Sequence, residues 1–188
     1  MTVLVIGVLL WVFVHLIPTV EQPLRKIMID RIGYNGYRGV FSLLVLTGLV
    51  LMVVGYRSTP PEIVFMPPPW AGTAGFVLMV IAFLLIGAAH HPTRIKRYLR
   101  HPMLTGTALW GLGHLLQTGT SRALILFGGL ALWALIEIPL INRRDGPVEA
   151  PDAPAFSEEL KGIFISGLIL GVVLILHHYL GGVSPLPR

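Results

Sequence analysis

Residues 1–20, MTVLVIGVLLWVFVHLIPTV, form an apolar stretch about as long as a membrane-spanning helix. A helix needs roughly 20 mostly apolar residues to cross the hydrocarbon core of a bilayer. No basic segment precedes the stretch and no pair of small residues typical of a cleavage site follows it, so we expect a retained helix rather than a signal peptide. The whole chain is similar in character: 54% of its 188 residues are hydrophobic and 12% are charged, against about 25% charged in soluble domains.

Five further stretches have a comparable length and composition. We therefore predict an all-α fold, namely a polytopic transmembrane helical bundle of about six spans that forms a single domain over residues 1–188. The predicted spans are residues 2–20, 37–56, 70–89, 102–118, 121–141 and 162–180. The fourth span is the weakest of the six, because it is short and rich in glycine.

The basic residues alternate between loops in a way that predicts the orientation of the chain. Eleven of the fourteen Lys and Arg residues lie in the first, third and fifth loops: Arg25, Lys26, Arg31, Arg38, Arg94, Lys96, Arg97, Arg100, Arg143, Arg144 and Lys161. Because cytoplasmic loops carry the excess of basic residues, we expect both termini on the outer side. Orientation thus accounts for most of the net charge of +5, and we expect no nucleic-acid partner.

Histidines are the main candidates for chemistry inside the membrane. The chain has seven histidines and no cysteine, which excludes thiolate metal ligands and leaves imidazole as the natural ligand for a metal or haem. His15 and His114 have apolar neighbours on both sides, and Glu137 is an ionisable residue within the fifth span. Intramembrane ionisable residues are functional candidates, although a histidine can also simply bridge two helices by a hydrogen bond.

The fourth span offers a possible surface for a flat ligand. Thr107, Gly111 and His114 share one face of a helix by their spacing, and Gly111 would leave room for a macrocycle beside the imidazole. Close helix packing would use the same glycine. Counting residues along the spans places His177 nearer to His114 in depth, and His15 nearer to His101. The partner of His114 therefore remains open at this point.

Several segments together resemble the NnrU family of bacterial membrane proteins. They are HLIP (15–18), YRGVFSLLVLTGLVLMVVGY (37–56), PPPW (67–70), RHPMLTGTALWGLGHLL (100–116) and LHHYLGGVSP (176–185), which occur in the family's order. The resemblance implies a multi-pass protein of the bacterial inner membrane. It also implies an association with denitrification, because the family takes its name from the expression of nitric-oxide and nitrite reductases.

The NnrU family is similar to zeta-carotene isomerase, a membrane enzyme that contains haem b. The haem histidines of that enzyme match His15 and His114, so the resemblance implies haem b as a cofactor with these two residues as metal ligands. His177, in the terminal motif, is a third candidate ligand. Arg100 and His101 are candidates to hold a haem propionate, and Gly111 to make room for the ring. A cysteine that serves the isomerase as an alternative ligand falls at Gly111, so ligand exchange of that kind is not implied.

The leading hypothesis is a haem-binding protein of the lipid bilayer. Its role would be either isomerase-like or linked to redox chemistry or nitric oxide. Its partner would be an apolar substrate or a respiratory reductase. One alternative is a methyltransferase, because RHPMLTG (100–106) resembles the S-adenosylmethionine-binding segment Arg-His-Pro-x-Tyr-x-Gly of isoprenylcysteine-type enzymes, with Leu104 in place of the aromatic residue. Another alternative is a non-catalytic assembly factor for a respiratory reductase.

Overall fold

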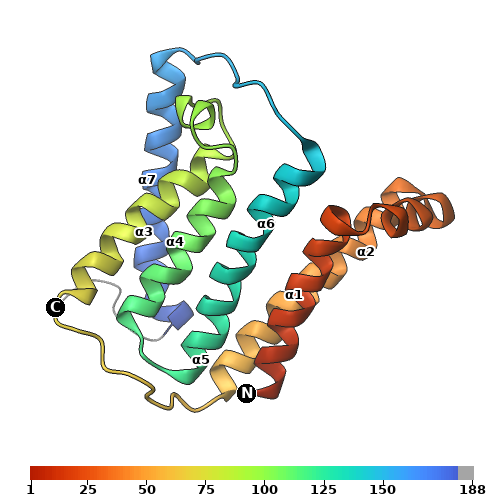
Figure 1. Cartoon of the computed structure of the whole chain (residues 1–188). Coiled ribbons are helices and arrows are strands. Elements are labelled where there is room, and N and C mark those ends of the chain that lie inside the picture. The colour runs from red at the N-terminus through yellow and green to blue at the C-terminus, as the bar shows by residue number, and fades with distance from the viewer. Residues whose placement is uncertain (182–188) are drawn as a thin grey trace. The chain divides into compact units, whose positions relative to one another are not determined.

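The computed structural model describes residues 1–181 of the chain, which fold into α-helices joined by loops (Figure 1). The helices are α1 (Thr2–Val20), α2 (Gln22–Ser58), α3 (Ala71–Ala88), α4 (Pro102–Gln117), α5 (Ser121–Ala123), α6 (Gly129–Asp145) and α7 (Phe156–Gly181). A π-helical turn, Leu124–Gly128, joins α5 to α6, and a short 3₁₀ helix, Arg94–Arg97, lies between α3 and α4. The predicted all-α helical membrane bundle is confirmed.

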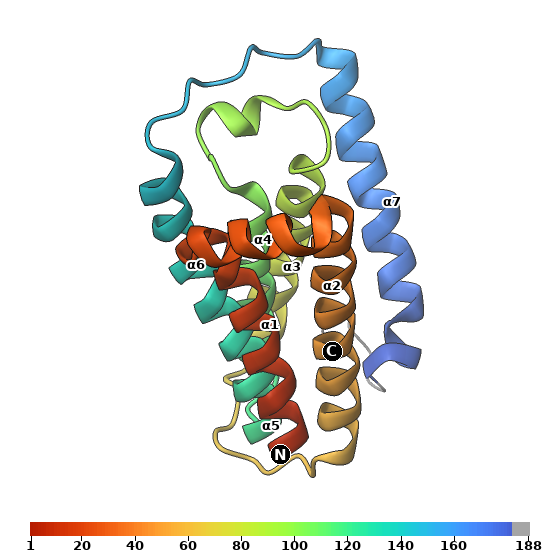
Figure 2. The same ribbon diagram turned by 90° about the vertical axis from the view of Figure 1, so that its right-hand side faces the viewer.

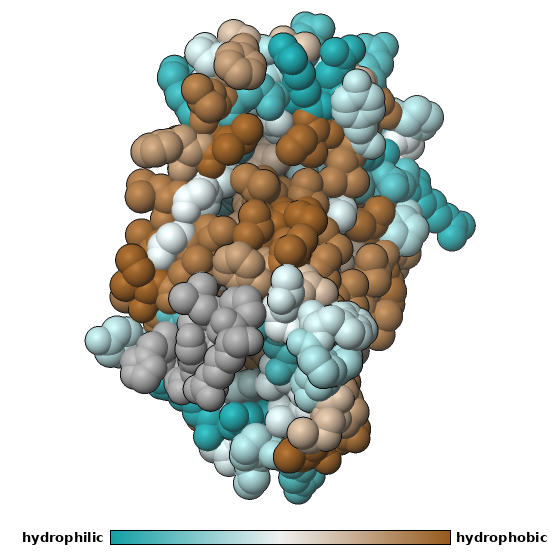
Figure 3. Space-filling view, turned by 90° about the vertical axis from the view of Figure 1, so that its left-hand side faces the viewer, coloured by the Kyte–Doolittle hydropathy of each residue, from teal (hydrophilic) through white to brown (hydrophobic). Residues whose placement is uncertain are grey.

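Five helices in the described part of the chain are long and apolar enough to cross a membrane. They are α1, α2, α3, the continuous run Ser121–Asp145, and α7. The predicted fourth span is also a helix, α4, but it has 16 residues and so measures about 24 Å, less than the roughly 30 Å of a hydrocarbon core. Figure 3 shows a broad area of hydrophobic residues on one face of the protein.

The chain divides into two compact units. Unit 1 contains Met1–Phe65 and Thr120–Gly146, and thus α1, α2, α5 and α6. Unit 2 contains Met66–Gly119 and Pro147–Arg188, and thus α3, α4 and α7. The single domain over residues 1–188 stays a prediction.

In unit 1, glycines bring the backbones of α1 and α2 into contact. A Cβ atom added at Gly7 would lie 2.7 Å from the backbone nitrogen of Met52, and one added at Gly55 would collide with the backbone of Leu4. Gly48 lies opposite Gly7 in the same contact. Small residues are the usual means by which membrane helices approach each other closely, and Gly7, Gly48 and Gly55 have this role between α1 and α2.

The segment after α1 differs from the charged loop that the sequence suggested. Residues 22–32 are helical, and α2 continues from there to Ser58 across a break at Gly33, whose φ is 74° and ψ 163°. Leu24, Ile27 and Met28 recur at helical spacing among the charges, a pattern typical of an amphipathic helix, and only glycine adopts such a positive φ without strain. Figure 2 shows the first part of α2 lying across the direction of the second.

In unit 2, α4 packs on α3 through a second set of glycines. A Cβ atom at Gly75 would lie 2.7 Å from the carbonyl oxygen of Gly113, and one at Gly106 would lie 2.8 Å from that of Ala82. By contrast, a Cβ atom at Gly167 or Gly171 of α7 would meet nothing within 4 Å. Gly167 and Gly171 have the four-residue spacing of a helix-packing motif, but they make no such contact among the described residues.

Gly55→Ala should destabilise the protein, because the new methyl group meets the rigid backbone of Leu4. Overpacking of this kind costs about 1–3 kcal/mol, measurable as earlier loss of folded protein when the detergent-solubilised protein is heated. Gly39→Ala is the matched control, since Gly39 also lies in α2 and a Cβ atom there meets nothing within 4 Å. Equal stability of the two variants would contradict the close approach of α1 and α2.

Candidate functional site

His15 lies in α1 with its ring held by its own helix. Its Nδ1 is 2.8 Å from the carbonyl oxygen of Trp11, one turn earlier. A carbonyl oxygen only accepts hydrogen bonds, so Nδ1 carries the proton and donates it. The imidazole also stacks on the indole of Trp11, with ring centroids 4.4 Å apart.

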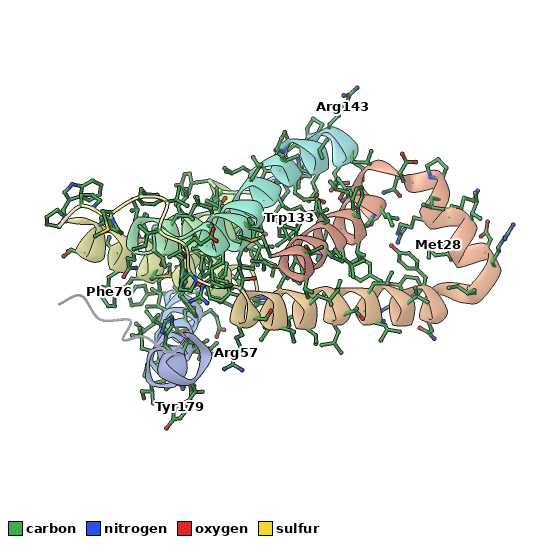
Figure 4. The ribbon with its side chains drawn as sticks, turned by 90° about the horizontal axis from the view of Figure 1, so that it is seen from below. Met28, Arg57, Phe76, Trp133, Arg143 and Tyr179 are labelled. Atoms are coloured by element: carbon green, nitrogen blue, oxygen red, sulfur yellow. The ribbon has the colours of Figure 1, made fainter. Side chains whose placement is uncertain are left out.

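Aromatic rings from two other helices of unit 1 pack against the same imidazole. The ring centroid of Trp133 in α6 is 4.9 Å from that of His15, and the centroid of Phe41 in α2 is 5.5 Å away. Figure 4 labels Trp133 where α6 lies beside α1. Three aromatic rings, all of them from unit 1, therefore pack against the imidazole of His15.

A buried carboxyl group lies close to His15. Glu137 of α6 is only 3% exposed, and its Oε1 accepts a hydrogen bond from the hydroxyl of Thr19 in α1. Its other oxygen, Oε2, is buried and has no hydrogen-bond partner among the described residues. Sequence reasoning identified Glu137 as an ionisable residue in a span but gave it no role, because the contact with Thr19 joins residues far apart in the chain.

His114 lies near the end of α4 and repeats the arrangement seen at His15. Its Nδ1 is 2.9 Å from the carbonyl oxygen of Trp110, and the two rings are 4.7 Å apart between centroids. The chain thus contains the pattern Trp-x-x-x-His twice, at residues 11–15 in unit 1 and 110–114 in unit 2. The sequence shows this repetition, but only the structure shows that both histidines donate to the carbonyl of their tryptophan.

A second histidine lies opposite His114 within unit 2. The imidazole centroids of His114 in α4 and His177 in α7 are 6.2 Å apart, and the two ring planes differ by 24°. Counting residues along the spans had placed these two side chains at a similar depth, and the structure confirms that they are neighbours. Residues 182–185, the end of the terminal motif, lie outside the described residues.

Three other predicted site residues of unit 2, Gly111, Arg100 and His101, lie in α4 or just before it. Gly111 is buried in α4. Arg100 and His101 are half-buried at the start of α4. His101 precedes His114 by 13 residues, a separation of about 20 Å along a helix. The pairing of His15 with His114, and the binding of one haem by His114 together with Arg100 and His101, therefore stay predictions.

No group of three or more His, Cys, Asp and Glu side chains in the described part of the chain is arranged to hold a metal ion. A bare zinc ion in a structural site takes four protein ligands. A haem iron, in contrast, already has four ring nitrogens and takes only one or two ligands from the protein. The histidines of this chain lie singly or in pairs, so they could supply the one or two protein ligands that a haem iron takes.

A family model described as NnrU protein matches residues 3–185. The chain belongs to the NnrU family. No curated protein and no solved structure matches it. The resemblance to NnrU proteins is thereby confirmed over both units, while the relation to zeta-carotene isomerase stays a prediction.

Thr19→Val should destabilise this NnrU protein, because it removes the hydroxyl group that donates to Glu137 and leaves both carboxyl oxygens without a partner. A buried polar group left unsatisfied costs about 1–3 kcal/mol, measurable by thermal unfolding in detergent. Thr47→Val is the control, since the hydroxyl of Thr47 donates only to a carbonyl of its own helix on an exposed surface.

A double variant separates this cost from simple loss of packing. Replacing both partners by apolar groups removes the unsatisfied carboxyl, so Thr19→Val with Glu137→Leu should regain most of the stability lost in Thr19→Val alone. If the double variant is the less stable of the two, the contact between Thr19 and Glu137 does not carry the effect.

Proposed function

We propose that this NnrU protein binds haem b inside the membrane through its intramembrane histidines, and that His114 would be one of the residues that hold it. The observation that supports this most directly is the hydrogen bond from Nδ1 of His114 to the carbonyl oxygen of Trp110. Histidines that ligate a metal usually donate their other ring N–H in this way, which fixes the ring and leaves Nε2 as the ligand atom. His15 shares the feature with Trp11.

The surroundings of His114 support a site for a group that must stay dry. Gly106 and Gly113 face α3, where their backbone is in close contact with that helix, whereas His114 faces α7, as its contact with His177 indicates. The imidazole is thus held between helices of unit 2 and away from bulk water.

When bound, the haem would supply a one-electron redox centre that can also bind a small ligand such as nitric oxide. The residues of the chain would hold it, exclude water and fix the orientation of the ligand ring. We propose on this basis a redox or nitric-oxide-linked role associated with denitrification, or an isomerase-like reaction on an apolar substrate. The protein would act in the bacterial inner membrane with both termini outside, alone or with a respiratory reductase.

Purified wild-type protein in detergent should show a Soret band that changes on reduction with dithionite. His114→Ala should lose most of this band, because the variant lacks a residue that is proposed to hold the haem. His90→Ala is the matched control and should keep the spectrum, since His90 is an exposed histidine just after α3.

A wild-type protein that stays colourless after incubation with haem would contradict the proposal. Binding of S-adenosylmethionine by that colourless protein would then support the methyltransferase alternative suggested by residues 100–106. Loss of the band in His90→Ala as well as in His114→Ala would show that the spectrum reports folding and not ligation.

A further inference from the structure

We infer that residues 22–38 of unit 1 form a binding surface for the anionic headgroups of membrane phospholipids, centred on Arg25 and Lys26. The surface consists of the first part of α2, residues 22–32, and of the start of the second part after the break at Gly33. It lies outside the histidine sites, so the inference does not depend on haem binding. The length of α2, the pattern of its side chains and their charge support it.

The length of α2 places its first part outside the hydrocarbon core of the bilayer. The 37 residues of α2 would measure about 56 Å as one straight helix, almost twice the roughly 30 Å of the core. Residues 34–58 alone measure about 37 Å and are long enough to cross it. The break at Gly33 turns residues 22–32 out of this direction, so that they lie across the second part of α2 (Figure 2). The first part of α2 therefore lies along the membrane surface.

The side chains of residues 22–32 have the distribution of a helix that lies in the membrane interface. Met28 lines a hollow against α1 and the second part of α2, whereas Leu24 and Ile27 are 42% and 50% exposed and share one side of the helix. Arg31 also lies on this side, where a long side chain can cover apolar surface while its charged end reaches water. Exposed apolar residues on a basic helix are typical of a segment that is partly immersed in the headgroup layer.

Two tyrosines just after the break mark the level of the interface. Tyrosine is enriched where the hydrocarbon core meets the headgroups, because its ring is apolar and its hydroxyl polar. The guanidinium carbon of Arg25 lies 5.7 Å from the ring centroid of Tyr37, and that of Arg38 lies 5.7 Å from the ring centroid of Tyr34. Both arginines are thereby held beside interfacial rings, at the depth of the lipid phosphates.

A hollow with two basic side chains lies beside the first turns of α2. It has a volume of about 490 Å³ and is lined by Gln22, Pro23, Arg25, Lys26 and Ile29. Ligand pockets have volumes of about 300–1,000 Å³, so the hollow has room for a whole headgroup and not only for a single ion. Neither Arg25 nor Lys26 forms an ion pair with a carboxylate in the described part of the chain. Both charges are therefore available to a phosphate group, which arginine and lysine bind by charge-assisted hydrogen bonds.

The segment as a whole carries an excess of positive charge. Among residues 22–38, Asp30 is the one acidic residue, against four basic residues: Arg25, Lys26, Arg31 and Arg38. Glu21, directly before the segment, reduces this excess but does not reverse it. Each Lys or Arg close to an anionic membrane surface strengthens binding about fivefold. The charge thus selects anionic over zwitterionic lipids.

The test measures which lipids gather at this surface in the full-length protein, reconstituted in bilayers of phosphatidylglycerol and phosphatidylcholine. The chain has no cysteine, so Ile27→Cys provides a single position for a fluorophore, and one lipid at a time carries a nitroxide quencher on its acyl chain. Labelled phosphatidylglycerol should quench more strongly than labelled phosphatidylcholine. This preference should fall about fivefold for each charge removed in Arg25→Gln with Lys26→Gln. Arg94→Gln with Arg97→Gln is the matched control, because it removes the same charge from exposed arginines of unit 2, and it should keep the preference.

Several outcomes would overturn the inference. Absence of quenching by either lipid would show that residue 27 does not lie at the interface, and equal quenching by both would show that the surface does not select anionic headgroups. An equal loss of preference in the control would reveal general attraction to the charge of the protein. Loss of the preference on addition of glycerol 3-phosphate would assign the hollow to a soluble phosphate compound. If the double variant does not fold, Lys26→Gln provides the test, because the side chain of Lys26 is exposed, and the preference should then fall about fivefold.

Discussion

The arrangement of this protein depends on the close approach of helix backbones at glycine. Inside a bilayer, lipid tails are as apolar as leucine, so helices gain little from burying apolar side chains and must associate by close packing. Gly7 and Gly55 allow this between α1 and α2, and Gly75 and Gly106 between α3 and α4. Two helices whose backbones are in contact cannot slide or rotate against each other without a clash, so these contacts fix the depth and the rotation of each helix.

These fixed contacts decide where the polar side chains lie. Gly106 and Gly113 are one heptad apart and face α3, so His114, next to Gly113, points to one side of that contact, where His177 of α7 meets it. In unit 1, the contact of α1 with α2 leaves Trp11, His15 and Thr19 on a shared face of α1. This face meets Trp133 and Glu137 of α6 through the aromatic contacts and the hydrogen bond to Thr19.

Sequence reasoning predicted the features that depend on one segment at a time. Hydropathy gave the helices and their approximate ends, and motif order gave the family. It missed the helix at residues 22–32, because the charges there obscured its apolar spacing, and it missed the break at Gly33 that follows. It also could not choose between His15 and His177 or assign a partner to Glu137, since the contacts of His177 and Glu137 lie between helices far apart in sequence. The glycines of α7 show the same limit: Gly167 and Gly171 have the spacing of a packing motif but no neighbour within 4 Å.

The short length of α4 decides the surroundings of His114. A helix that ends within an apolar region leaves carbonyl groups that need donors. Two polar residues at its end supply them: Nε2 of Gln117 donates to the carbonyl oxygen of Gly113 at 3.2 Å, and Oγ1 of Thr118 donates to that of His114 at 2.9 Å. These two hydrogen bonds therefore allow α4 to end one turn after His114. Because the helix stops there, its negative end lies beside the imidazole of His114 instead of a turn or more beyond it.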